Sequence, residues 1–144
     1  MSTLSTANIQ SKAANTPPVI KDLNGTECGQ FCRAWVTYRG DNNTILDSFN
    51  VSSITDNNPG DFTINFTNSM QNANYCVAGT IANTQNNFTS ATAGATRGQG
   101  GIQIKGTTVP TVSSVNIETL YGAHPSVNAA KFDTSRCYVV VLGD

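Results

Sequence analysis

The chain has 144 residues, of which 12% are charged, and its formal net charge is −1. So few charges do not generate the positive field with which proteins recruit nucleic acid or anionic membranes. The polarity comes instead from Asn, Thr and Ser, which together make up 48 of the 144 residues. Because these residues suit turns and exposed strand faces better than helix interiors, the composition predicts an all-β protein with one folded domain.

The first 30 residues are predicted to form an extended N-terminal arm. They are polar, carry scattered apolar residues, and include a Pro-Pro pair that forces an extended backbone. Such a segment cannot build a core, and a terminus of this kind is mobile unless something ties it down. We therefore expect residues 1–30 to anchor the protein on a partner subunit, although an arm folded back on its own domain is the alternative. The expected anchoring residues are Leu4, Ile9, Pro17, Pro18 and Ile20.

Residues 31–144 are predicted to fold as an antiparallel β-sandwich of jelly-roll type. Seven short apolar or alternating runs separated by turn formers are typical of this architecture. The predicted strands are residues 31–38, 45–52, 61–67, 74–82, 101–107, 112–121 and 136–142. A hairpin turn is expected at residues 39–43. The polar stretch 83–100 is expected to be a long surface loop with one short edge strand around Phe88.

The clearest strand is predicted at residues 61–67, which follow a cluster of turn formers at residues 56–61. Phe62, Ile64 and Phe66 alternate with polar residues, and this period of two places the apolar set on a core. The strand at residues 136–142 differs, because it is apolar on both faces. That pattern predicts a central strand of the sandwich.

No catalytic, cofactor or metal site is expected. The single histidine, His124, has no Gly-x-Ser-x-Gly nucleophile near it, and this favours an ordinary loop position. Asp56 and Asp61 flank one turn, so a calcium site there is an alternative to simple turn capping. The start of the chain lacks a secretory signal, and synthesis in a cytosol is expected to leave the cysteines as free thiols. These cysteines are Cys28, Cys32, Cys76 and Cys137.

Aromatic residues offer the remaining candidates for a binding surface. Most of them are expected in the core, including Trp35 in the middle of a strand, but any that are exposed could form a sugar-binding platform. The aromatic candidates are Trp35, Tyr38, Tyr75, Phe88, Tyr121 and Tyr138. Phe88 stands isolated in a polar loop and, with Arg97 and Arg39, is a candidate surface contact. The tripeptide Arg39-Gly40-Asp41 has the letters of an integrin motif but is predicted to be a hairpin tip.

Three tracts of the chain follow one another in a specific order. They are AWVTYRG, then SFNVSSITDNNPGDFTINFTNSMQNANYCVAGT, then a hydrophobic last strand ending YVVVLGD. In this order they resemble a module in virion proteins of phages that infect cyanobacteria and other aquatic bacteria, and the leader before them is similar as well. The chain departs from that module at Asn57-Asn58-Pro59-Gly60, where an Asn-Gly turn is usual.

The resemblance implies a structural protein without catalytic residues, located on the virion and made in the host bacterial cytoplasm. We expect a tail-associated fibre or adaptor module that is anchored by its arm and presents a surface, with a host glycan as one candidate contact. A capsid decoration protein that staples the shell is the alternative, and a lectin or a glycan-active enzyme is a third. The expected partners are other virion proteins and two further copies in a homotrimer, because cyclic symmetry closes the edges of one-sided sheets. Nucleic acid and membrane insertion are not expected.

Overall fold

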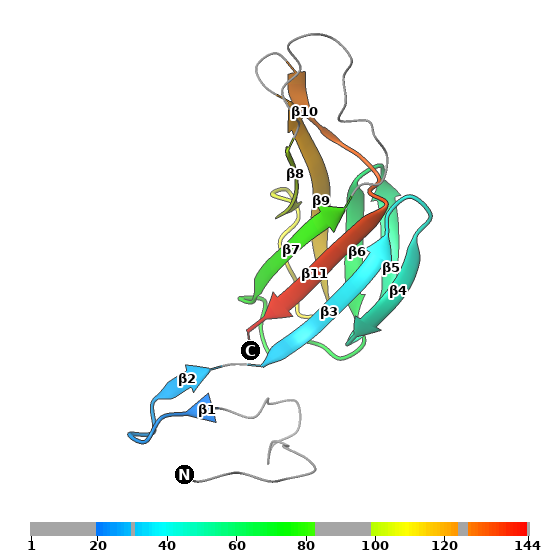
Figure 1. Ribbon diagram of the computed structural model, residues 1–144. Helices are drawn as coiled ribbons and strands as arrows, with labels where there is room; N and C mark the ends of the chain where they lie inside the picture. The colour runs from blue at the N-terminus through cyan, green and yellow to red at the C-terminus, as the bar shows by residue number, and fades with distance from the viewer. Residues whose placement is uncertain (1–19, 30, 83–98, 124–126, 144) are drawn as a thin grey trace.

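Strands that alternate between apolar and polar residues pair into sheets that share a core. The structure is a computed structural model, and it describes residues 20–29, 31–82, 99–123 and 127–143. Every regular element in these ranges is a β-strand, and the strands form three antiparallel sheets. Figure 1 shows the two larger sheets packed face to face. The prediction of an all-β sandwich is confirmed.

One layer of the sandwich is a four-stranded sheet with the order β4-β3-β11-β7. Its strands are β4 (Thr44–Phe49), β3 (Cys32–Arg39), β11 (Arg136–Leu142) and β7 (Cys76–Ala82). The last strand, β11, pairs with β3 on one side and with β7 on the other. Its predicted central position is therefore confirmed.

The second layer is a five-stranded sheet. Its strands are β5 (Val51–Asn58), β6 (Asp61–Phe66), β8 (Gln99–Ile104), β9 (Ser114–Ala123) and β10 (Val127–Lys131). β9 pairs with β8 along one edge, while β6 and β10 follow each other along its other edge. The junction lies at Thr119, because Asp61 pairs with Glu118 and Lys131 pairs with Leu120.

The predicted strand at residues 45–52 is in fact divided between the two layers. The chain breaks at Asn50, which has a positive φ of 55°, so β4 ends in one sheet and β5 begins in the other. The side chain of Asn50 holds this crossing, because its Nδ2 donates to the carbonyls of Arg33 and Asn68. Asn tolerates the left-handed region better than most residues, and this makes the break possible in an otherwise strand-like run.

The turn predicted at residues 56–61 is shorter than expected, since β5 continues to Asn58. Pro59 and Gly60 make the turn, and Gly60 has a φ of 67°. A Cβ at this position would lie 2.4 Å from the backbone nitrogen of Phe132, so the close approach of the chain requires glycine. The Gly60 N–H also donates to Asp133, which ties the turn to the segment before β11.

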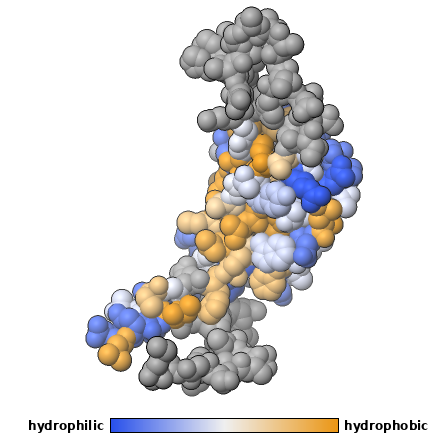
Figure 2. Space-filling model, viewed as in Figure 1, coloured by the Kyte–Doolittle hydropathy of each residue, from blue (hydrophilic) through white to orange (hydrophobic). Residues whose placement is uncertain are grey.

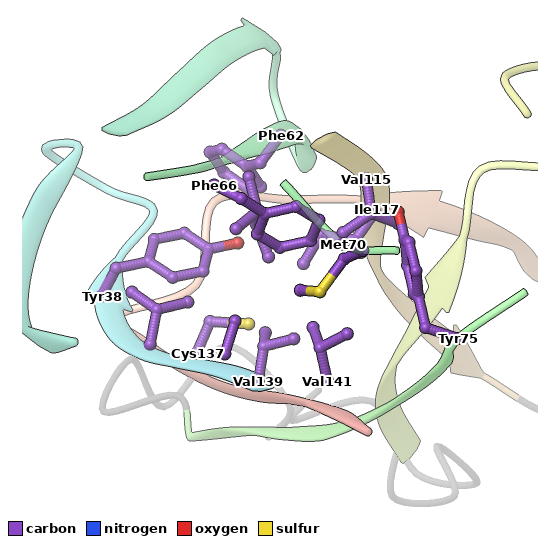
Figure 3. Packing of buried hydrophobic residues seen from close by; sticks show 13 residues of the cluster. Tyr38, Phe62, Phe66, Met70, Tyr75, Val115, Ile117, Cys137, Val139 and Val141 are labelled. Carbon is purple, nitrogen blue, oxygen red and sulfur yellow. The ribbon is translucent and has the colours of Figure 1, made fainter. Parts of the chain in front are cut away.

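The core fills the space between the two layers (Figure 3). Phe62 and Ile64 are fully buried and Phe66 nearly so, which confirms the predicted orientation of β6. Tyr38 packs edge-to-face on Phe62 and Tyr75 on Phe66, with ring centroids 5.4 and 5.7 Å apart. The buried cluster consists of Ala34, Val36, Tyr38, Phe62, Ile64, Phe66, Met70, Tyr75, Val115, Ile117, Cys137, Val139 and Val141.

The described part of the N-terminal arm is a small hairpin that stands apart from the sandwich (Figure 1). It consists of β1 (Ile20–Lys21) and β2 (Glu27–Gly29). The carboxylate of Asp22 closes the turn by accepting the N–H groups of Asn24 and Thr26. Ile20 therefore opens a strand, whereas the other predicted anchoring residues lie outside the described residues. Those residues are Leu4, Ile9, Pro17 and Pro18.

Candidate functional site

The outer surface of the four-stranded sheet carries a row of apolar side chains. Cross-strand partners lie on the same side of a sheet, so Phe49, Trp35, Val140 and Ala78 form one row across all four strands. We call this surface the aromatic face. It consists of Phe49, Trp35, Val140 and Ala78, of Asp47, Thr37, Tyr138 and Thr80 in the next row, and of Leu142 and Cys76 in a third.

The aromatic face is open along its length. Phe49 is 54% exposed, Leu142 41% and Tyr138 38%, while Trp35 and Val140 are half-buried between them. A shallow depression lies over β3, β11 and β7 and is lined by Trp35, Thr37, Gly79, Thr80, Tyr138 and Val140. Figure 2 shows apolar side chains gathered over this sheet. Exposed apolar surface of this kind is a candidate interaction site.

Several hydrogen-bonding groups on the aromatic face have no partner in the described part of the chain. They are the indole N–H of Trp35 and the hydroxyls of Thr37, Thr80 and Tyr138. These groups lie beside apolar rings and point away from the core. The face therefore combines apolar contact area with a few unused donors and acceptors, as binding sites for small organic ligands do.

The outer surface of the five-stranded sheet is different, because its side chains bond to one another. We call it the polar face; it consists of Ser53, Thr55, Asn57, Asp61, Thr63, Asn65, Gln103, Lys105, Asn116, Glu118 and Lys131. Nδ2 of Asn65 donates to the hydroxyls of Ser53 and Thr55, both at 3.0 Å. Nδ2 of Asn116 donates to the hydroxyl of Thr63 at 3.1 Å.

An ion-pair cluster occupies one end of the polar face, where β6, β8, β9 and β10 meet. Asp61 is 2% exposed and accepts a hydrogen bond from Nζ of Lys105 at 2.7 Å, with Nζ of Lys131 at 3.6 Å. Lys131 also pairs with Glu118, which accepts a further hydrogen bond from Gln103 at 2.8 Å. The long side chains of neighbouring strands thus cover two carboxylates that the strand pattern directs toward solvent.

The environment of the cluster keeps both carboxylates ionised. Burial raises the pKa of Asp61, but hydrogen bonds from Lys105 and Asn57 and the charges of the two lysines outweigh it and hold the pKa below its usual value. The hydrogen bond from Lys131 lowers the pKa of Glu118, and the same contact raises the pKa of Lys131. The acidic side chains are neutralised by lysines, so their role here is structural.

The surface contacts predicted from the sequence lie in different parts of the chain. Arg39 is half-exposed and donates to both carboxylate oxygens of Asp41, at 3.0 and 2.8 Å, and this contact lowers the pKa of Asp41. Because the two charged residues of the Arg39-Gly40-Asp41 tripeptide bind each other at a hairpin tip, the turn interpretation is confirmed. Phe88 and Arg97 lie outside the described residues.

The prediction that Trp35 belongs to the core is wrong. Its neighbours Ala34 and Val36 take the inward positions, so the alternation of β3 turns Trp35 outward. Tyr38 and Tyr75 are buried as expected, whereas Tyr138 faces outward on β11. The sequence signal for this face was the two-sided apolar character of residues 136–142, which predicted a central strand but not an uncovered outer side.

The other candidate chemistries find no site in the described residues. Asp56 accepts a hydrogen bond from Asn43 and Asp61 faces Lys105, so the two acids bind different partners. Across the same described ranges, no group of three or more His, Cys, Asp or Glu side chains could hold a metal ion. The four cysteines are free thiols, and His124 falls outside the description. No described helix is long and apolar enough to cross a membrane.

Comparison of the chain with protein-family models, with curated protein sequences and with solved structures gives no match. The functional argument therefore rests on the residues and geometry described above.

Proposed function

We propose that the chain is a non-enzymatic structural protein of a bacteriophage virion, a tail-associated fibre or adaptor module made in the bacterial cytoplasm. The N-terminal arm attaches it to other virion proteins, and the sandwich is the part that it presents. The resemblance of its sequence tracts to phage virion modules supports the location. The observation that carries the proposal is the hairpin β1–β2, which lies outside the sandwich (Figure 1).

The hairpin has the properties of a docking element. A two-stranded hairpin is marginally stable in water on its own, so a surface that covers it would stabilise it. Leu23 at its tip is 103% exposed, and Ile20 is 43% exposed on its first strand. An apolar side chain on a projecting turn can enter a partner pocket without disturbing the sandwich core.

A homotrimer is the proposed assembly. The four-stranded layer ends in the edge strands β4 and β7, and the five-stranded layer ends in β5, β8 and β10. The outward backbone groups of these edge strands can pair with another chain. Cyclic symmetry around a virion appendage would bring such edges together. Light scattering at micromolar concentration tests this directly, since a monodisperse monomer that also lacks threefold contacts on the particle would contradict it.

The arm is tested by assembling virions with the chain truncated to residues 30–144 and measuring its copy number per particle. We expect a folded sandwich, as judged by circular dichroism, that is missing from the particles. Leu23→Asp should reduce incorporation in the same assay. Val109→Asp is the matched control, because Val109 is 80% exposed but belongs to a loop of the sandwich.

Near-normal incorporation of the truncated chain would show that the anchor lies elsewhere. The copy number of the unaltered chain also separates the two locations. Hundreds of copies per virion would indicate capsid decoration, the alternative role, and a few to a few dozen would indicate the tail.

A further inference from the structure

We propose that the aromatic face binds an uncharged oligosaccharide chain, laid across β4, β3, β11 and β7. This inference deepens the proposed function, because it names the chemistry that the presented sandwich would contact on a host surface. It rests on three features of the face: exposed rings in adjacent positions, hydrogen-bonding groups beside them that have no partner in the described residues, and a depression with no charged side chain in its lining.

The rings provide the contact area. Phe49 and Trp35 are direct cross-strand partners, and Tyr138 lies diagonally from Trp35 on the next strand. Neighbouring strands lie about 4.8 Å apart, a spacing comparable to the length of one pyranose ring, so adjacent sugars can stack on adjacent side chains. The C–H faces of a sugar are apolar and suit the exposed rings, which makes stacking favourable without any charge.

The hydrogen-bonding groups of the aromatic face can donate to and accept from the hydroxyls of a sugar. The Trp35 N–H donates, and the hydroxyls of Thr37, Thr80 and Tyr138 both donate and accept; none has a partner in the described ranges. Thr37 and Thr80 flank Tyr138 in the same row of the sheet. A ligand that is apolar on its ring faces and rich in hydroxyls at its edges matches this arrangement.

The charge distribution favours a neutral ligand. Among the outward-facing residues described for this sheet, the charged side chains are Arg33 and Arg39 on β3, Asp47 on the edge strand β4 and Arg136 at the start of β11. None of these four residues lines the depression that contains Trp35 and Tyr138. The depression itself therefore offers no counter-charge to an anionic or cationic polymer.

The size of the face argues against a second copy as its occupant. Four strands at about 4.8 Å and three rows about 6.6 Å apart span roughly 400 Å². Two such faces would bury about 800 Å², below the roughly 1,200 Å² at which stable protein interfaces begin. An oligosaccharide needs no such area, and the depression over Trp35 is shallow and open enough to admit one.

Trp35 makes the test direct, because it is the single tryptophan of the chain. The full-length protein is titrated with cellohexaose, maltohexaose, chitohexaose and mannohexaose while tryptophan emission and heats of binding are recorded. We expect at least one of these to shift the emission saturably, with a matching calorimetric isotherm. Tyr138→Ala should weaken that binding by roughly tenfold or more, which corresponds to about 1.4 kcal/mol.

Two controls keep the result specific to this face. Tyr138→Phe keeps the ring and should retain most of the affinity, while Thr55→Ala changes an exposed residue of the polar face and should leave it unchanged. Circular dichroism verifies that each variant is folded.

Absence of any emission change or heat with all four hexasaccharides would overturn the inference, and so would equal loss of binding in Thr55→Ala. An emission shift that depends on protein concentration alone would also overturn it, because it would mean that a second copy covers the face. None of these outcomes affects the arm, which is tested separately by incorporation into virions.

Discussion

The two outer faces of the sandwich use their polar groups in opposite ways. On the polar face, side chains such as Asn65 and Asn116 donate hydrogen bonds to side chains on neighbouring strands, and the charge of buried Asp61 is neutralised by Lys105. On the aromatic face, Thr37 and Tyr138 stand beside exposed rings with their hydroxyls unused in the described structure. Polar side chains that already hydrogen-bond to one another leave few donors and acceptors for a ligand. The difference supports the proposal that the aromatic face binds a ligand, whereas the polar face contributes to stability.

The core that both faces share should show the largest mutational effect. Phe62→Ala removes a fully buried ring that packs on Tyr38, and we expect a loss of roughly 3–5 kcal/mol in the free energy of unfolding. Urea denaturation followed by circular dichroism measures it. Thr67→Ala, one position past the end of the same strand and exposed, should change stability by no more than about 0.5 kcal/mol. Equal losses would mean that β6 is oriented the other way.

A smaller loss is expected from the ion-pair cluster of the polar face. Asp61→Asn keeps the shape of the side chain but removes the charge that Lys105 contacts at 2.7 Å. Because Asp61 is buried, we expect a cost of about 1–3 kcal/mol in denaturant unfolding. Asp47→Asn changes an exposed carboxylate on the edge strand β4 and should lower the free energy of unfolding by no more than about 0.5 kcal/mol. Similar losses of stability in Asp61→Asn and Asp47→Asn would contradict the role of the polar face in stability.

The same cluster predicts a loss of stability in acid. The folded-state pKa values of Asp61 and Glu118 lie below their usual values, so the stabilisation is fully present above the unfolded pKa values of about 4. It is lost as the pH falls through the lower, folded-state values. Unfolding free energies measured from pH 7 to pH 2 should fall below about pH 5. Asp61→Asn should show a weaker fall, and an unchanged profile would exclude Asp61 as a contributor.

Much of this architecture could be predicted from local pattern. The alternation in residues 61–67 gave the orientation of Phe62, Ile64 and Phe66 correctly, since a period of two leaves no ambiguity once one face is apolar. Asn50 shows where local pattern fails: residues 45–52 form a continuous strand-like run, and the break depends on a side chain that bonds Arg33 and Asn68 from other elements.

The aromatic face could not be predicted for a related reason. Residues 136–142 are apolar on both sides, and such a run indicates burial on both sides unless the topology leaves one uncovered. Whether a layer covers the outer side of β3 and β11 depends on the order of all the strands, which no segment encodes by itself. The ion pairs of Asp61 were missed for the same reason, because Lys105 and Lys131 are far away in sequence.

The smallest expected stability effect distinguishes an open aromatic face from a covered one. Phe49→Ser removes a ring from the same row as Trp35, but 54% of that residue is already exposed to water. We expect a loss of less than about 1 kcal/mol in urea denaturation, far below that of Phe62→Ala. If the face were covered by another copy or segment, Phe49 would behave as a core residue and the two losses would be similar. A small loss of stability together with weakened hexasaccharide binding is the result that assigns Phe49 to recognition. Because the ring contributes little to folding, its removal would weaken binding through the lost contact with the sugar and not through unfolding.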